Sequence, residues 1–367
     1  MEKNSDRFYG DRLRIARTFK ALTQAELGEK VSASAAFICQ LEAGRKQPTD
    51  PLLQALSEAL GFAPSFFTQP VGDEFRDEEC NFRRRKTTPQ YLRNQVLAHG
   101  TLFGAVVEHL DERLSLPSPN IPDVPVNANA RREEIERAAE KARLHWGLGL
   151  DVPITNMTRV LERAGVVVTR FAGIGEKIDA FSRAGVRDVV VLNPSKDSPS
   201  RSRFDLAHEC GHLVMHRGME TGTPEREEQA NHFAAAFLLP RAGFVREYGH
   251  RPRIQWTHLR QLKKRWGVSL AAIVRRAYDL QLIDAREYRR AYKYIHAKGW
   301  HKGEPDEPPE EKHEVIPLAF QALERLSKKT TWHLAADLDL EPSILEKLTG
   351  VHVPVQDPTA RRLRLAK

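Results

Sequence analysis

The sequence has little cysteine and no long apolar run, and these absences exclude several classes of protein. The three cysteines, Cys39, Cys80 and Cys210, lie far apart among 367 residues and form no CxxC pair. A disulfide-stabilised secreted domain is therefore excluded, and a reducing compartment is expected. No apolar stretch approaches the length of a membrane span, and the polar N-terminus does not resemble a signal peptide. We therefore expect a cytoplasmic protein without a membrane partner.

The positive charge of the chain is concentrated in one segment. The whole sequence has a formal net charge of +8, whereas residues 241–302 alone contain 16 Lys or Arg and only 4 Asp or Glu. A field concentrated in this way favours a polyanionic partner such as single-stranded DNA, with Arg275 and Arg276 as phosphate contacts. The alternative is an ordinary solvated helical surface.

Hydrophobic periodicity and turn residues predict an α+β chain that is mostly α. Helical spacing dominates, and β-type runs occur only at residues 166–171, 180–183 and 189–192, which predicts a small sheet. Five segments are expected. They are an N-terminal helical domain (1–70), a helical connector and linker (71–130), a domain containing the sheet (131–240), a basic helical region like a second helix-turn-helix (241–302), and an acidic linker, disordered over 303–314, with a small helical appendage (303–367).

The segment Ala207-His208-Glu209-Cys210-Gly211-His212 carries the sharpest chemical signal in the chain. Two histidines four residues apart lie on one face of a helix, so both imidazoles can bind one metal ion. Glu209, next to the first histidine, is then placed to act as a general base. The alternative is a core helix with two hydrogen-bonded histidines and no metal.

A catalytic zinc needs a third protein ligand, and the helix expected over residues 224–238 is the place to look. Glu227 shares the apolar face of that helix and is the preferred ligand, while Glu228 points about 100° away and is the fallback. Asn231 lies one turn after Glu227 and is expected to hold a ligand in place. His216 and His232 are expected to have supporting or structural roles. The pattern predicts one Zn²⁺ per chain.

These motifs resemble the ImmA/IrrE family of bacterial zinc metallopeptidases. The resemblance rests on AHECGHLVMH, on EEQANHFAAAFLLP ending at Pro240, and on the strand before them, and it covers about residues 130–300. It implies a zincin-like domain with His208, His212 and Glu227 as zinc ligands and Glu209 as catalytic base. It further implies that a strand can bind a substrate peptide by β-addition, and that the substrate is a helix-turn-helix repressor in a stress or mobile-element response.

Residues 9–66 resemble the XRE/Cro family of helix-turn-helix domains, which implies a five-helix-type fold. The matching pieces are Leu22-Thr23-Gln24-Ala25-Glu26-Leu27 and Ile38-Cys39-Gln40-Leu41-Glu42-Ala43-Gly44. Such a fold places the helix from Ser34 to Ala43 in the major groove of double-stranded DNA. Base readout is expected from Ser34, Ala35, Ala36 and Gln40, and phosphate contacts from Gln24, Arg45 and Lys46.

The N-terminal domain is almost neutral, with 9 basic and 8 acidic side chains in residues 1–70. Weak binding by a monomer, strengthened in a homodimer, is one explanation, and use of the domain for protein contacts is another. Two functions stay open. The first is a zinc endopeptidase fused to a DNA-binding regulator, and the second is a transcription factor whose zinc-site domain is a sensor or a non-catalytic scaffold.

Overall fold

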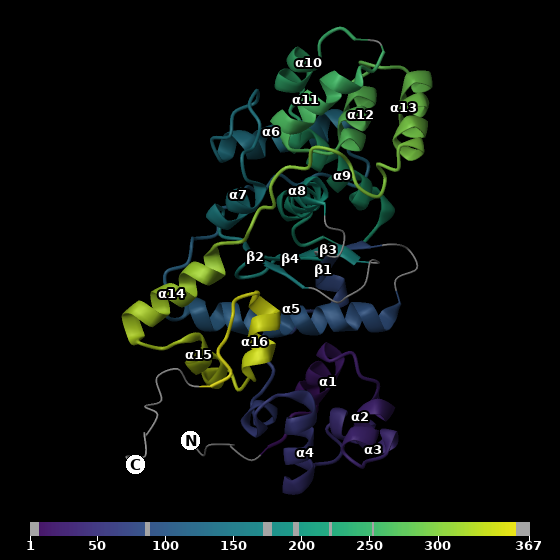
Figure 1. Ribbon diagram of the computed structural model, residues 1–367. Helices are drawn as coiled ribbons and strands as arrows, with labels where there is room; N and C mark the ends of the chain where they lie inside the picture. The colour runs from purple at the N-terminus through teal and green to yellow at the C-terminus, as the bar shows by residue number, and fades with distance from the viewer. Residues whose placement is uncertain are drawn as a thin grey trace, which may run out of the picture.

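The computed structural model describes residues 7–84, 89–171, 178–193, 198–219, 222–251 and 253–356. It is mostly helical, with one small sheet, as the sequence predicted. A long central helix, α5 (Gln90–Asp111), separates two bodies: the N-terminal helices α1–α4 lie on one side, and the sheet with α6–α13 lies on the other (Figure 1). Among the described residues, no helix combines the length and apolar character needed to cross a bilayer.

The N-terminal domain contains four helices and a 3-10 turn. They are α1 (Gly10–Phe19), α2 (Gln24–Lys30), α3 (Ala35–Glu42), α4 (Asp50–Leu60) and η1 (Pro64–Thr68), so the 3-10 turn stands at the fifth position. Thr23 and Glu26 form a capping box at the start of α2. Gly61, with φ +76°, ends α4 in the left-handed conformation that glycine adopts without strain.

The sheet contains four strands in the order β1-β3-β4-β2. β2 (Val167–Arg170) pairs in parallel with β4 (Val189–Leu192), and β3 (Ile178–Arg183) pairs antiparallel with β4. The sequence did not predict β1 (Cys80–Arg84), which comes from the connector and pairs antiparallel with β3. The domain that contains the sheet therefore takes one strand from the segment that follows the N-terminal domain.

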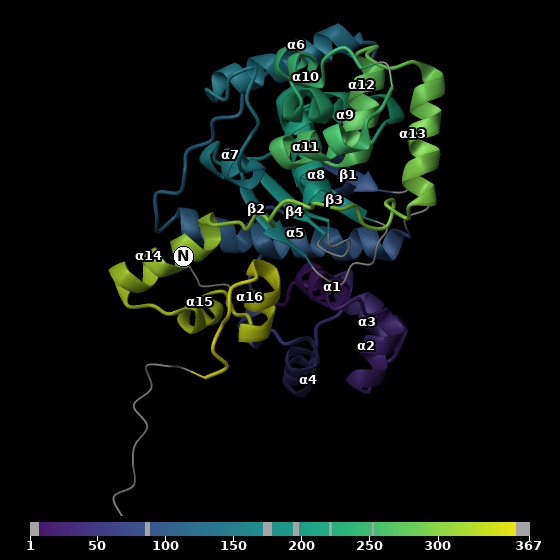
Figure 2. The same ribbon diagram turned by 45° about the horizontal axis from the view of Figure 1, so that its top comes forward.

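Helices cover the face of the sheet that lies away from α5. They are α6 (Arg132–His145), α7 (Met157–Arg163), α8 (Pro199–Met215), α9 (Pro224–Leu238), α10 (Arg241–Tyr248), α11 (Trp256–Trp266), α12 (Leu270–Asp279) and α13 (Ala285–Ala297). Figure 2 shows α8 next to the sheet, with α10–α13 beyond it. The apolar sides of α6–α13 share one hydrophobic core with this face of the sheet.

The C-terminal part folds back onto the N-terminal half. Helices α14 (Val315–Ser327), α15 (Thr331–Asp337) and α16 (Pro342–Thr349) share a second core with α1–α5 and the other face of the sheet (Figure 1). The five segments expected from the sequence are thus packed into two cores. The link between them, residues 303–314, was predicted to be disordered, and this was wrong. It is an extended segment fixed by ion pairs, which we call the acidic strap.

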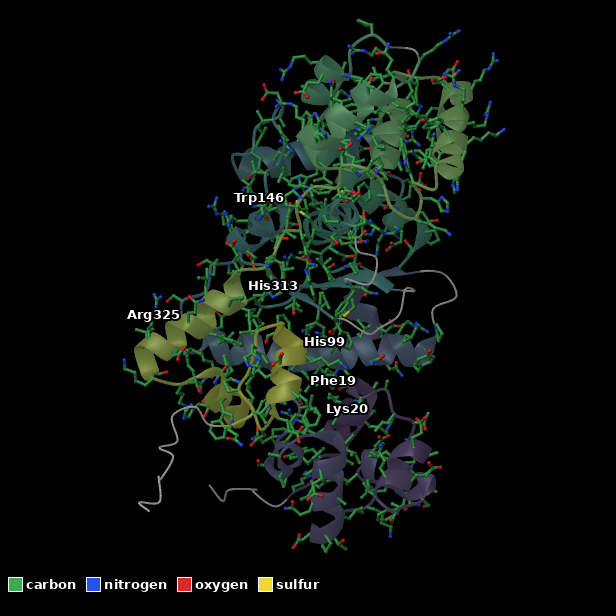
Figure 3. The ribbon with its side chains drawn as sticks, in the orientation of Figure 1. Phe19, Lys20, His99, Trp146, His313 and Arg325 are labelled. Carbon is green, nitrogen blue, oxygen red and sulfur yellow. The ribbon has the colours of Figure 1, made fainter. Side chains whose placement is uncertain are left out.

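His99, on α5, lies fully buried where the two bodies meet (Figure 3). Its ring stacks on Phe171 with 3.8 Å between centroids, and also packs between Phe19 and Phe103. Neither ring nitrogen has a hydrogen-bond partner among the described residues. Burial, with a smaller contribution from the charge of Lys347, lowers the pKa of His99 to about 3. The folded protein therefore holds this imidazole neutral.

Candidate metal centre

The candidate metal centre lies where α8 and α9 pack together. His208 and His212 project from α8 one turn apart, and Glu227 lies in the first turn of α9. Close packing of the two helices depends on Gly211, because a Cβ there would come within 3.0–3.2 Å of the Phe233 side chain. Glycine at this position lets α9 bring its carboxylate up to the two histidines.

The three side chains bring their ligand atoms into one tight triangle. The Nε2 atoms of His208 and His212 lie 3.1 Å apart, and the Glu227 oxygens lie 3.4 Å and 3.3 Å from them. A tetrahedral site with bonds of about 2.0–2.1 Å separates neighbouring ligand atoms by roughly 3.3–3.4 Å. The three donors therefore fit one divalent cation of that size.

Hydrogen bonds on the far side of each imidazole orient the Nε2 atoms toward the triangle. Asn231 Oδ1 lies 3.1 Å from Nδ1 of His208, which fits the role predicted for Asn231. Because an amide oxygen only accepts, Nδ1 of His208 carries the proton and Nε2 keeps its lone pair. Asn231 therefore orients His208 from the same helix that carries Glu227.

A longer relay orients His212. Its Nδ1 lies 3.0 Å from Nδ1 of His216, and Nε2 of His216 donates over 2.9 Å to Oε1 of Gln229. The Gln229 amide nitrogen in turn donates to the carbonyls of Asn127 and Ala128. Burial lowers the pKa of His216 to about 4, so its Nδ1 is free of a proton at neutral pH and accepts from His212.

The two candidate glutamates lie in different surroundings. Burial acts to raise the pKa of Glu227, but the adjacent imidazoles of His208 and His212 outweigh burial and hold this pKa below its ordinary value. Glu227 is therefore ionised at neutral pH, as a cation ligand must be. The side chain of Glu228 is 66% exposed and faces His232 at 3.4 Å, away from the triangle. The geometry favours Glu227.

Glu209 is fully buried on α8 between the histidines and the sheet. Its Oε2 accepts a hydrogen bond of 2.5 Å from the hydroxyl of Ser182, a buried residue of β3. This bond fixes one carboxylate oxygen and links the histidine helix to the strand beside it. Sequence reasoning missed Ser182, since a single serine in a short strand carries no spacing signal. It also missed Gln229, because a single glutamine on a helix carries no such signal either.

The proposed DNA-reading residues lie together on the N-terminal domain. Ser34 caps α3 by accepting from the Phe37 amide over 3.1 Å, and Ala35 and Ala36 are exposed beside it. Gln40 is half-buried on the same helix. Arg45 and Lys46 are exposed just beyond α3. Gln24 instead donates to Glu42 over 2.7 Å, and Glu42 also pairs with Arg17, so Gln24 helps to fix α3 against α2.

Known protein families match two parts of the chain. A family model described as the helix-turn-helix domain matches residues 9–65, and one described as the IrrE N-terminal-like domain matches residues 161–278. The chain joins a helix-turn-helix domain to an IrrE-like peptidase domain. Both resemblances found in the sequence are thereby confirmed. The IrrE-like domain, residues 161–278, contains the whole ligand triangle and Glu209.

Two individual proteins are also similar to the chain. The HTH-type transcriptional regulator PrpR of Mycobacterium tuberculosis is 25% identical over 75% of this chain, and the match spans 64% of that regulator. The crystal structure of Bacillus thuringiensis PlcR in complex with the peptide PapR7 and DNA covers 80% of this chain and 98% of its own, at 12% identity and a TM-score of 0.15. At that TM-score the likeness to PlcR carries no argument about the fold.

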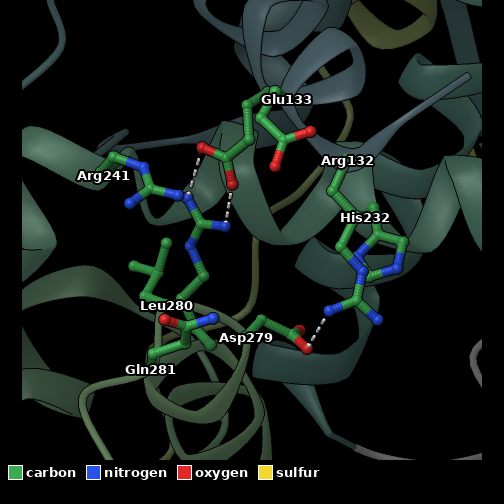
Figure 4. A pocket seen from close by; sticks show the side chains of 9 residues that line it. Arg132, Glu133, His232, Arg241, Asp279, Leu280 and Gln281 are labelled. Atoms are coloured by element: carbon green, nitrogen blue, oxygen red, sulfur yellow. Dashed lines mark hydrogen bonds and ion pairs between the residues drawn. The ribbon is translucent and has the colours of Figure 1, made fainter.

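Arg276, one of the predicted phosphate contacts, is buried beside the IrrE-like core. Its guanidinium bonds Glu136 through two nitrogens and donates to the Leu239 carbonyl. Glu136 and Arg276 line a pocket together with Arg132 and Asp279, which form a second ion pair (Figure 4). Because Arg276 is only 3% exposed, the prediction that it binds phosphate is not supported by its position.

Much of the remaining positive charge of residues 241–302 is also paired. Lys263 is fully buried and contacts Glu304 and Glu307 of the acidic strap at 2.8 and 2.6 Å. Further pairs join Arg260 and Lys264 to Asp306, Arg265 to Glu247, and Arg275 to Asp279. The strap thus neutralises part of the basic segment, and the concentration of charge in the sequence overstates the field at its surface.

Proposed function

We propose that this protein is a DNA-binding transcriptional regulator whose IrrE-like domain is a zinc-dependent endopeptidase. The observation that carries the proposal is the triangle of His208, His212 and Glu227 with the Glu209 carboxylate buried next to it. Three nitrogen and oxygen ligands with room for a fourth position are typical of catalytic zinc, whereas structural zinc is usually closed by four protein ligands.

The residues of the site have distinct tasks in peptide hydrolysis. Zinc in such a site supplies Lewis-acid chemistry, which polarises a peptide carbonyl. Glu209 is the proton-transfer group: it takes the proton of the attacking water and passes it to the amine that leaves. Ser182 holds the Glu209 carboxylate in place through Oε2. Asn231 and His216 fix the imidazole orientations.

The substrate class follows from the resemblance to the ImmA/IrrE family. We propose that the substrate is a repressor-type protein with a helix-turn-helix domain, cleaved in a stress or mobile-element response. The second candidate function is a transcription factor with a non-catalytic metal site. The name of the regulator that matches 75% of the chain favours it, because that name assigns regulation and no peptidase activity.

Glu209→Gln is expected to retain the metal and to lose cleavage by about 10²–10⁴-fold, because the amide cannot accept the proton of water. The measurement is mass spectrometry of bacterial proteins after incubation with the zinc-loaded chain. Glu228→Gln is the matched control, since it removes an exposed carboxylate from the neighbouring helix. Equal cleavage by wild type and Glu209→Gln would refute the endopeptidase proposal.

For the N-terminal domain we propose binding of double-stranded DNA through α3, as a homodimer. Gln40→Ala is expected to relax preference at one operator base, by about 1–3 kcal/mol of discrimination, and to leave nonspecific affinity nearly unchanged. Arg45→Gln should instead weaken binding to all sequences and reduce the salt dependence. Specificity profiling of both variants checks this, and a Gln40→Ala profile identical to wild type would remove Gln40 from base readout.

A further inference from the structure

The edge of the sheet beside the metal centre is already occupied by a segment of the same chain. In the antiparallel pairing of β1 with β3, Asn81 lies opposite Ser182 and Cys80 opposite Arg183. Ser182 is the residue whose hydroxyl binds Glu209. Partners directly opposite each other in an antiparallel pair point to the same face of the sheet, so buried Asn81 faces the Glu209 side.

β1 is attached to the sheet along one side only, as a bound peptide would be, and its buried Cys80 side chain belongs to the hydrophobic core. It forms the outer edge of the sheet, pairs with no strand except β3 among those described, and comes from a connector outside the IrrE-like domain. Its register with β3 shifts between Arg83 and Arg84, where regular pairing is interrupted. The edge that remains when β1 is removed offers a row of main-chain donors and acceptors next to Glu209.

One side chain of β3 fastens the segment that leads into β1. Arg183 binds both carboxylate oxygens of Asp73 at 2.5 Å, contacts Glu79 at 3.2 Å, and lies over the Phe75 ring at 4.4 Å. The Arg183 side chain is 11% exposed, whereas the Asp73 side chain is 63% exposed. This clamp, formed by Arg183 with Asp73, Phe75 and Glu79, is thus accessible to solvent at its acidic end.

We propose that β1 is a displaceable internal occupant of the peptide-binding edge, and that an extended peptide reaches the metal centre by replacing β1 on β3. This inference rests on the proposed function and specifies its regulation and the form of its substrate. The clamp sets the fraction of molecules whose edge is open, and the apparent affinity for peptide is reduced by that fraction. The peptide that binds is extended, pairs antiparallel with β3, and competes with residues 80–84.

Arg183→Cys tests the proposal in a single protein. The new cysteine lies opposite Cys80, so oxidation with diamide locks β1 onto β3, while the reduced form lacks the clamp. The probe is a fluorescent synthetic peptide of residues 77–84 with serine in place of Cys80. Binding is followed by anisotropy in chains that carry Glu209→Gln, to prevent hydrolysis, and Cys39→Ser, because Cys39 is an exposed thiol.

The reduced Arg183→Cys chain is expected to bind the peptide about tenfold more tightly than the Arg183 chain. The oxidised chain, with the cross-link verified by mass spectrometry, should not bind it. Adding Cys80→Ser removes the cross-link and should give equal binding under both conditions. Binding by the oxidised chain that equals binding by the reduced chain would overturn the proposal.

A second variant gives the same information without a disulfide. Asp73→Asn combined with Glu79→Gln opens the clamp and leaves β3 unchanged, and it should also tighten peptide binding about tenfold. Glu112→Gln, which removes an exposed carboxylate that pairs with its neighbour Arg113, is the control. Equal binding by the double variant and this control would also overturn the proposal. Since binding is measured without turnover, a chain that hydrolyses nothing but shows these affinities would refute the endopeptidase and leave the role of β1 intact.

Discussion

Replacing His208 or His212 with alanine is expected to abolish tight zinc binding. Two remaining protein ligands cannot hold a tetrahedral zinc ion tightly, and each imidazole supplies one corner of the observed triangle of ligand atoms. Glu227→Ala should weaken binding by several orders of magnitude. Asn231→Ala should weaken it by about 10–100-fold, because the His208 ring would lose the acceptor that fixes its tautomer. Competition with a chromogenic chelator measures each affinity.

Glu228→Ala is the matched control, since Glu228 is the residue after Glu227 on α9 but faces His232. Its zinc affinity should equal that of the wild type. A stronger effect of Glu228→Ala than of Glu227→Ala would reverse the choice of third ligand. Wild-type affinity in both histidine variants would place the metal elsewhere in the chain.

Replacing His99 with leucine is expected to make the free energy of unfolding much less sensitive to a fall in pH. His99 has an ordinary pKa of 6.5 when exposed and a pKa of about 3 in the fold, so protons bind preferentially to the unfolded chain between these values. Stability from this group is therefore complete above pH 6.5 and is lost as the pH falls toward 3. The difference amounts to about 2 kcal/mol at pH 5 and to about 5 kcal/mol at full titration.

At pH 7 the same substitution removes two buried nitrogens that lack partners, which outweighs the lost stacking on Phe171 and should stabilise by about 1 kcal/mol. Urea unfolding at pH 7 and pH 5 measures both effects. His250→Leu, at an exposed position, should change neither. Parallel pH profiles of wild type and His99→Leu would show that His99 is not the group responsible.

The features that the sequence predicted well depend on local spacing. Two histidines four residues apart fix their own geometry on a helix, and Glu227 is distinguished from Glu228 by the apolar face it shares. The capping box of α2 and the serine that caps α12 are equally local, because each joins residues three positions apart. Nothing beyond one or two helical turns is needed to find these residues.

The features that the sequence did not predict depend on contacts between distant segments. β1 lies about 100 residues before its partner β3, and its short basic sequence shows no strand periodicity. The acidic strap has the composition of a disordered linker, yet its carboxylates meet Lys263 and Arg203. The predicted phosphate contact at Arg276 failed for the same reason, since Glu136 precedes it by 140 residues. Charge along a sequence does not show which charges the fold pairs.

The acidic strap also determines where this protein can be divided. A fragment that ends at residue 302 keeps all 16 basic side chains of the basic segment and loses Glu304, Asp306 and Glu307, which pair with three of them. Lys263, fully buried in the intact chain, would then carry an uncompensated charge. Such a fragment would adhere to DNA, heparin and cation-exchange resin at low ionic strength whatever the intact protein binds. Binding of such a truncated fragment to nucleic acid would therefore result from the loss of the acidic strap and would not show that the intact protein binds nucleic acid.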